Sequence, residues 1–222
     1  MGLRGGTLSD ALEAVREITG PVGPLEALLD QPNGPPRAAV VFAHPLPTAG
    51  GTMHTKVVFQ GAKALTRIGC VVLRFNFRGV GRSAGAWDEG RGEMDDYRAA
   101  VDFLSTKYPD LEMWAAGFSF GSHIAMTCGA DDDRVCALIG IAPPVNRYEY
   151  ATVVGSTKPK FIIHGERDEL IPLRAVREFY ARLAEPKELV EIDRAGHLFD
   201  GQASEVGDAL EELLTDFTCR TR

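Results

Sequence analysis

Short, continuous apolar runs alternate with amphipathic stretches along most of the chain. Continuous runs of this kind are typical of strands that are buried on both faces of a sheet. Weaker strand patterns lie at 15–18 and 25–29, on either side of Gly20-Pro21. We expect the remaining strands over 38–45, 70–77, 111–118, 135–144, 160–166 and 187–193.

Stretches with helical spacing lie between these runs. In 53–68, for example, Val57, Ala64, Leu65 and Ile68 can share one face of a helix. We expect helices over 53–68, 93–107, 120–129, 173–184 and 203–217. Alternating strands and helices predict an α/β fold with a mostly parallel, doubly wound sheet and helices on both faces. We expect one domain over 1–222, in which the two weak N-terminal strands are a candidate β-hairpin.

Charge and length narrow the range of partners. The chain has 222 residues and a net charge of −7, without a cluster of Lys and Arg. Nucleic acids and anionic membranes are therefore not expected as partners. Residues 1–15 hold no apolar stretch of signal-peptide length, and no segment approaches the roughly 18 apolar residues of a membrane-spanning helix. We expect a cytoplasmic protein that is a monomer or a homodimer.

Cysteine and histidine spacing gives no sign of a metal or cofactor. Cys70, Cys128, Cys136 and Cys219 form no CxxC pair, and two of them begin apolar runs. We expect all four to be buried, reduced thiols. The five histidines show neither HxxxH nor HExxH spacing, so no metal site is expected.

Three residues with catalytic potential follow predicted strands. Ser119, Asp168 and His197 come after the strands at 111–118, 160–166 and 187–193. Because the carboxyl ends of parallel strands meet at one edge of a sheet, we expect these side chains to lie together. A serine hydroxyl needs a base within hydrogen-bond reach, and the base needs an orienting carboxylate. His197 and Asp168 fit these two roles, with Glu166 and Glu169 as rivals of Asp168.

Glycines flank the candidate serine on both sides, in the stretch Gly117-Phe118-Ser119-Phe120-Gly121. A sharp turn from strand to helix exposes a serine hydroxyl, and such a turn needs very small residues two positions away on each side. The following helix points its backbone N–H groups toward the same place, where negative charge would develop. The stretch is therefore typical of a nucleophile turn.

Several motifs in order resemble the α/β-hydrolase superfamily. They are the glycine-flanked serine at 117–121, "HGERDELIP" at 164–172, "AGHLFDG" at 195–201 and "FNFRGVGRSAG" at 75–85. The likeness covers nearly the whole chain and is closest to small bacterial hydrolases that carry segments like "HPLPTAGGTMHTKVV" at 44–58. The resemblance implies the α/β-hydrolase fold and a Ser119–His197–Asp168 catalytic triad.

The resemblance also implies two backbone donors for an oxyanion hole. One is the N–H of the residue after the nucleophile, Phe120, and the other comes from the loop after the third strand. In that loop Pro45 and Pro47 have no N–H, so Leu46 is the expected donor.

Other residues near the strand ends have less specific roles. His44 and His164 are expected to hydrogen-bond neighbouring loops, and Arg78 to hold its loop by pairing with a carboxylate. Aromatic side chains near the serine can line an acyl pocket or belong to the core. The candidates for a substrate pocket are His44, Phe118, Phe199 and Trp87, with Phe120 as a further aromatic candidate.

The connection over 143–159 is too short for the helical cap that many superfamily members insert there. We therefore expect an open site without a cap domain. The leading hypothesis is a carboxylesterase-like serine hydrolase that cleaves small-molecule esters of short to medium acyl chain without a cofactor. A thioesterase, an amidase or peptidase, a perhydrolase and a non-catalytic protein that binds a small molecule or a partner remain alternatives.

Overall fold

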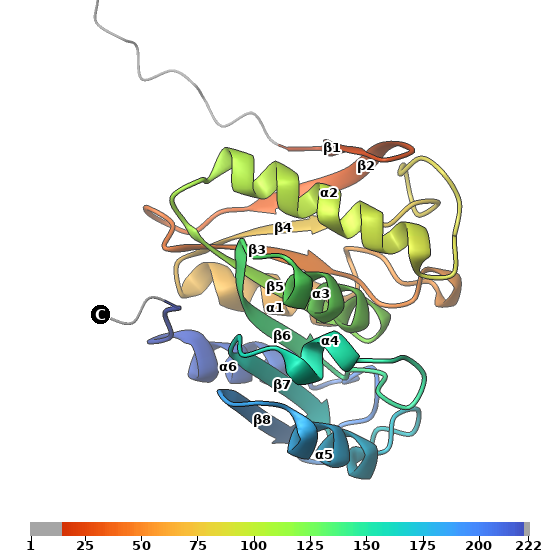
Figure 1. Ribbon diagram of the computed structural model, residues 1–222, viewed down its shortest axis with the longest axis vertical. Helices are drawn as coiled ribbons and strands as arrows, with labels where there is room; N and C mark the ends of the chain where they lie inside the picture. Colours follow the sequence, from red (N-terminus) through yellow and green to blue (C-terminus); the bar gives the residue numbers. More distant parts are fainter. Residues whose placement is uncertain (1–14, 220–222) are drawn as a thin grey trace, which may run out of the picture.

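A computed structural model describes residues 15–219 (Figure 1). The expectation of no signal-peptide-like stretch concerns residues 1–15, and all of these except residue 15 lie outside the described range. Eight strands form one sheet in the order β1-β2-β4-β3-β5-β6-β7-β8. Strands β3 to β8 run parallel to one another, and β2 is antiparallel to both of its neighbours, β1 and β4. The strands are β1 (Glu17–Gly20), β2 (Gly23–Asp30), β3 (Ala38–Ala43), β4 (Cys70–Phe75), β5 (Glu112–Phe118), β6 (Val135–Ile141), β7 (Lys160–Gly165) and β8 (Lys187–Ile192).

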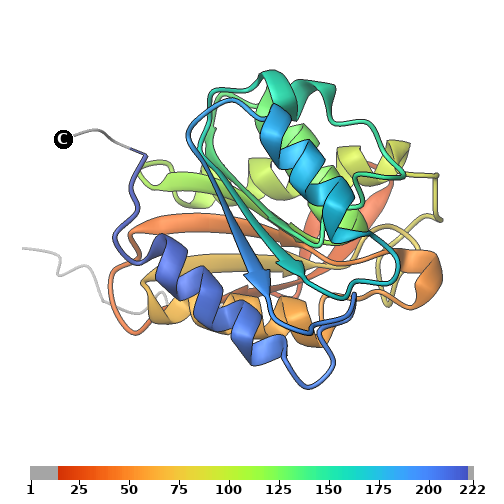
Figure 2. The ribbon, with the colours of Figure 1, turned by 90° about the horizontal axis from the view of Figure 1, so that it is seen from below.

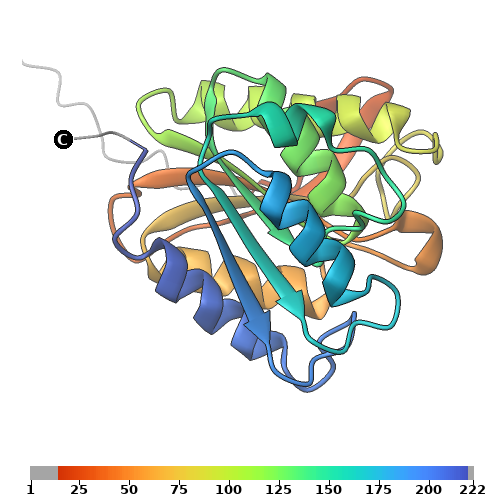
Figure 3. The ribbon, with the colours of Figure 1, turned by 60° about the horizontal axis from the view of Figure 1, so that its bottom comes forward.

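Helices cover both faces of the sheet, as predicted. Helices α1 and α6 lie on one face, and α2 to α5 lie on the other (Figures 2 and 3). They are α1 (Lys56–Arg67), α2 (Arg91–Lys107), α3 (Phe120–Asp131), α4 (Ala151–Gly155), α5 (Leu173–Arg182) and α6 (Ala203–Leu214), with a short 3-10 turn η1 (Pro47–Ala49). Within residues 15–219, no helix combines the length and the apolar character that crossing a bilayer demands.

The continuous apolar strands contribute side chains to two separate core layers, one on each face of the sheet. Every residue of β3 is buried. Val41 faces the layer under α2 and α3, whereas Val40 and Phe42 face the layer under α1 and α6. Because successive side chains of a strand point to opposite faces, a strand covered on both sides must be apolar at every position.

Two strands end before prolines that the predicted ranges included. Strand β3 ends at Ala43 and β6 ends at Ile141, before the prolines at 45, 143 and 144. Proline has no N–H to donate to a neighbouring strand, so after β6 the apolar run continues through Ala142 but the strand does not. The connection over 143–159 contains α4, a helix of five residues, and no cap domain.

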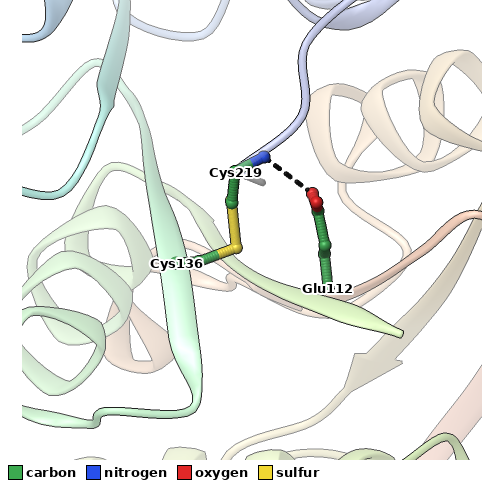
Figure 4. A group of neighbouring side chains, drawn as sticks. All are labelled: Glu112, Cys136 and Cys219. Carbon is green, nitrogen blue, oxygen red and sulfur yellow. Dashed lines mark hydrogen bonds between the residues drawn. A yellow bond between two sulfur atoms is a disulfide. The ribbon is translucent and has the colours of Figure 1, made fainter. Parts of the chain in front are cut away.

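The cysteine prediction is wrong for two of the four residues. Cys136 in β6 and Cys219 near the C-terminus form a disulfide, with Cα atoms 6.0 Å apart (Figure 4). Their 83-residue separation leaves no pattern in the sequence that would reveal the contact. Cys70 and Cys128 are buried thiols, as expected, and burial raises the pKa of each to about 12.

Candidate active site

The turn between β5 and α3 has the strained backbone that its sequence indicates. Ser119 adopts a positive φ of 52°, a conformation that L-residues rarely adopt. A Cβ atom on Gly117 would collide with the backbone of Gly121, and one on Gly121 would collide with the carbonyl groups of Ala43 and His44. Both glycines are therefore required by close backbone approach, and Ser119 is held at the edge of the sheet.

The structure brings Ser119, His197 and Asp168 into one hydrogen-bonded row. Ser119 Oγ lies 2.9 Å from His197 Nε2, and His197 Nδ1 lies 2.7 Å from Asp168 Oδ2. Asp168 and His197 are buried, whereas Ser119 is partly exposed. The three residues follow β5, β7 and β8, so the parallel strands deliver them to the same edge of the sheet.

Hydrogen bonds hold the Asp168 carboxylate in its ionised form. Its Oδ1 accepts the N–H groups of Leu170 at 2.9 Å and Ile171 at 2.8 Å. Burial opposes the charge, but the His197 ring and the Ile171 amide together outweigh burial, so the pKa of Asp168 lies below its ordinary value.

The two rival carboxylates bind backbone groups elsewhere. Glu169 Oε2 accepts the N–H of His197 at 3.3 Å, and Glu166 Oε2 accepts the N–H of Arg194 at 3.0 Å. In residues 15–219, Asp168 is the carboxylate that reaches the His197 ring.

Two backbone N–H groups beside Ser119 have no acceptor. The amides of Phe120 and Leu46 donate no hydrogen bond within the described part of the chain. Both residues line the cavity that contains Ser119 and His197. Unpaired amides at the beginning of a helix and in a proline-bounded loop suit an oxygen that gains negative charge.

The cavity above the serine is small and mostly apolar. Its volume is about 300 Å³, at the small end for a ligand site. It is lined by Pro45, Leu46, Ala49, Gly51, Ser119, Phe120, Pro144, Arg147, Tyr148, Glu169, Leu170, Ile171, His197 and Leu198.

Comparison with known families adds to this geometry. Residues 34–156 match the family described as serine aminopeptidase S33, which is more than half of the chain. The chain is an α/β serine hydrolase. It is 33% identical over 206 residues to the uncharacterised protein RP471 of Rickettsia prowazekii, covering 89% of this chain and 87% of that protein.

Two solved serine hydrolases are similar to this hydrolase over most of its length, and one of them lacks a lid. An α/β serine hydrolase homologue from Coxiella burnetii is 38% identical, with a TM-score of 0.85 and coverage of 89% of this chain and 95% of that one. XC6422 from Xanthomonas campestris, an α/β serine hydrolase without a lid, is 36% identical, with a TM-score of 0.82 and coverage of 88% and 90%. The resemblance to the lidless subgroup is thus confirmed.

Four of the five residues expected to line the pocket of this hydrolase lie outside its cavity, whereas Phe120 lines it. Phe118 and Phe199 are fully buried and pack against each other, and the Phe118 ring lies 5.7 Å from the His197 ring. Trp87 packs on the Phe120 ring at 5.2 Å, and His44 is fully buried. Three of these side chains therefore belong to the core beneath the site, and the half-buried Trp87 packs against that core.

Sequence reasoning missed most of the cavity wall. Leu170 and Leu198 directly follow the Asp168 and His197 turns, and both are exposed. Their position beside two candidate residues was a usable signal. Pro144 and Tyr148 come from the connection after β6, whose sequence gave no sign of which way it turns.

Two strand-end histidines hold loops of the site, as expected. His44 Nε2 accepts the N–H of Phe77 at 3.1 Å, and its Nδ1 lies 2.6 Å from the Pro45 carbonyl. Burial lowers the pKa of His44 to about 4, so the neutral ring can donate from Nδ1 and accept at Nε2. His164 Nε2 donates to the Ile171 carbonyl at 2.9 Å, behind the Asp168 turn.

The loop after β4 is held by a buried ion pair. Arg78 Nη2 lies 2.8 Å from Asp96 Oδ1, and the backbone N–H of Arg78 donates to Asp96 Oδ2 at 2.9 Å. The expectation that Arg78 pairs with a carboxylate is confirmed.

One group of potential metal ligands occurs in residues 15–219, and it lies away from the serine. Glu112, Cys136 and Cys219 come close together, but the two sulfur atoms are bonded to each other and Glu112 accepts the N–H of Cys219 (Figure 4). Glu112 begins β5, whereas Ser119 follows its other end.

Proposed function

We propose that this hydrolase cleaves carboxylic esters of short to medium acyl chain, with Ser119 as nucleophile, His197 as general base and Asp168 as the acid that orients it. One observation carries the proposal: Ser119 Oγ lies 2.9 Å from His197 Nε2, and the other ring nitrogen lies 2.7 Å from Asp168. This geometry lets the imidazole accept the serine proton while the carboxylate stabilises the imidazolium that forms.

The reaction proceeds through an acyl-enzyme. Ser119 Oγ attacks the carbonyl carbon while His197 Nε2 takes its proton, and the resulting oxyanion is bound by the N–H groups of Phe120 and Leu46. His197 then gives the proton to the leaving oxygen, and the ester bond breaks. A water molecule, deprotonated by His197, releases the acid and restores Ser119. No step requires a cofactor.

The size and opening of the cavity support small substrates. A volume of about 300 Å³ with apolar walls suits a short to medium acyl group. Within residues 15–219 no cap domain covers the cavity, since the connection after β6 carries only the five-residue α4. The monomeric or homodimeric state and the absence of nucleic acid partners stay predictions. The cytoplasmic location also stays a prediction. The Cys136–Cys219 disulfide is more typical of proteins in an oxidising compartment.

A matched substrate panel separates ester hydrolysis from its alternatives. Para-nitrophenyl butyrate, a butyryl thioester and butyryl para-nitroanilide present the same acyl group with three leaving groups. We expect kcat/KM to be highest for the ester and lowest for the anilide. The peptidase alternative is favoured by the description of the matched family and predicts efficient anilide cleavage. Hydrolysis of none of the three by folded protein would favour a binding protein.

Replacing Leu46 with proline tests the second oxyanion donor. Leu46 has a φ of −50°, which lies in the range that proline adopts. Leu46→Pro therefore removes the N–H without requiring a change of φ at this position. We expect kcat for the ester to fall by roughly 100- to 1,000-fold. Leu46→Ala is the control, because it removes the same side chain from the cavity and keeps the N–H. Equal losses in the two variants would contradict the role of the amide.

A further inference from the structure

Among residues 15–219, one arginine and one glutamate line the cavity, and they come from different loops. Arg147 lies in the connection between β6 and β7, and Glu169 lies in the turn that carries Asp168. The remaining wall is mainly apolar. A charge beside an apolar cavity influences which substrates bind there, because a substrate group of opposite charge can pair with it while the apolar part fills the cavity.

The two charges differ in what they contact. Glu169 Oε2 accepts the backbone N–H of His197 at 3.3 Å, so this carboxylate is already hydrogen-bonded to the turn that carries His197. Arg147 forms no ion pair, and its guanidinium donates no hydrogen bond, within residues 15–219. The five N–H donors of this guanidinium are therefore unpaired within the described part of the chain.

Neighbouring contacts fix the backbone that carries Arg147. Its own N–H donates to the Pro144 carbonyl at 3.0 Å, and Asn146 Nδ2 donates to the Leu170 carbonyl at 3.0 Å. On the other side, the Tyr148 ring stacks on His123 with centroids 4.4 Å apart. Arg147 is therefore held at the wall of the cavity, while its side chain stays exposed.

We propose that Arg147 binds a carboxylate of the substrate, at a distance from the scissile ester bond. The inference rests on the proposed ester hydrolysis and names its substrate class: esters with an apolar body and one negatively charged end. A guanidinium matches a carboxylate with two parallel hydrogen bonds, which fixes orientation as well as charge. With a net charge of −7 on the chain, a local cation favours the approach of an anionic substrate to this cavity.

The carboxylate can belong to the acyl group or to the alcohol, and two substrate pairs distinguish these sources. The acyl arm compares the para-nitrophenyl half-ester of glutaric acid with para-nitrophenyl pentanoate. The alcohol arm compares meta-carboxyphenyl butyrate with its methyl ester. In each arm, the quantity measured is the ratio of kcat/KM for the charged ester to that for the neutral ester.

We expect Arg147→Gln to lower this ratio by about 10- to 100-fold in one arm, which identifies the source of the carboxylate. Arg147→Lys, which keeps the charge but loses the paired hydrogen bonds, should give a ratio between those of the wild type and Arg147→Gln. Arg174→Gln is the matched control, because Arg174 is exposed on α5, pairs with Glu178 and lies outside the cavity lining. The effect should weaken at high salt.

The outcomes separate this inference from the function on which it rests. If neutral esters are hydrolysed but Arg147→Gln leaves both ratios unchanged, Arg147 does not bind a carboxylate and only the inference fails. An equal fall of the ratios in Arg174→Gln would also overturn it, since a change in overall charge would explain the result. If the wild-type protein hydrolyses neither the neutral nor the charged esters, the proposed ester hydrolysis fails, and the inference fails with it.

Discussion

Replacing Ser119 with alanine should lower kcat for ester hydrolysis on the order of 10⁶-fold. The variant lacks the oxygen that forms the acyl-enzyme, while His197, Asp168 and the two unpaired amides stay in place. Residual turnover would come from the oxyanion site and from binding alone. Progress curves with para-nitrophenyl butyrate measure the loss. Intact mass after fluorophosphonate treatment should show one adduct on the wild type and none on Ser119→Ala.

Ser122→Ala provides a control one turn of helix away. Ser122 Oγ donates to the Ser119 carbonyl at 2.6 Å, and its side chain is buried. Its removal costs one hydrogen bond of the turn but leaves the Ser119 hydroxyl, so we expect a far smaller loss and a normal adduct. Unchanged turnover in Ser119→Ala, or an adduct on that variant, would show that another group attacks the ester.

Much of the fold follows from the apolar pattern because the strands are buried on both faces. The run over 38–43 has no polar position, and its structure places alternate residues in two core layers. Strand ends were harder to predict, since hydrophobicity alone does not reveal where pairing stops. Pro143 follows an apolar residue, and β6 ends before it because proline offers no N–H.

Ser119, His197 and Asp168 could be predicted from the sequence, because each has a recognisable position next to a glycine-flanked turn or a strand end. Gly117 and Gly121 identify the turn at Ser119, since no Cβ fits at either glycine. Asp168 and His197 follow strands, and the parallel sheet brings strand ends together. Their contact over long separations is a property of the fold, and the order of elements was sufficient to infer it.

The cavity wall and the disulfide were not accessible, because they depend on where loops turn. Phe118 and Phe199 were candidates for the wall, yet their strand and turn direct both rings into the core. Arg147 comes from a connection with no repeating pattern. Cys136 and Cys219 meet only when the C-terminal segment returns to the start of β6.

Replacing Asp168 with asparagine should lower kcat by roughly 10⁴-fold without unfolding the protein. The asparagine carbonyl can still accept the N–H groups of Leu170 and Ile171. Its amide then faces His197 Nδ1 and favours the tautomer that carries its proton on Nε2. In that tautomer the ring cannot accept the Ser119 proton, although the 2.9 Å contact is kept. Ester kinetics together with the thermal midpoint Tm separate this loss from misfolding.

Glu169→Gln is the matched control for the neighbouring carboxylate. Glutamine keeps an oxygen that can accept the backbone N–H of His197, whose ring is oriented from the other side by Asp168. We expect Glu169→Gln to reduce kcat far less than Asp168→Asn. Fluorophosphonate labelling should also be much slower in Asp168→Asn than in Glu169→Gln, because attack by Ser119 requires the same proton transfer. If the two variants lose turnover equally, the orienting role belongs to both carboxylates, and the assignment to Asp168 alone is wrong.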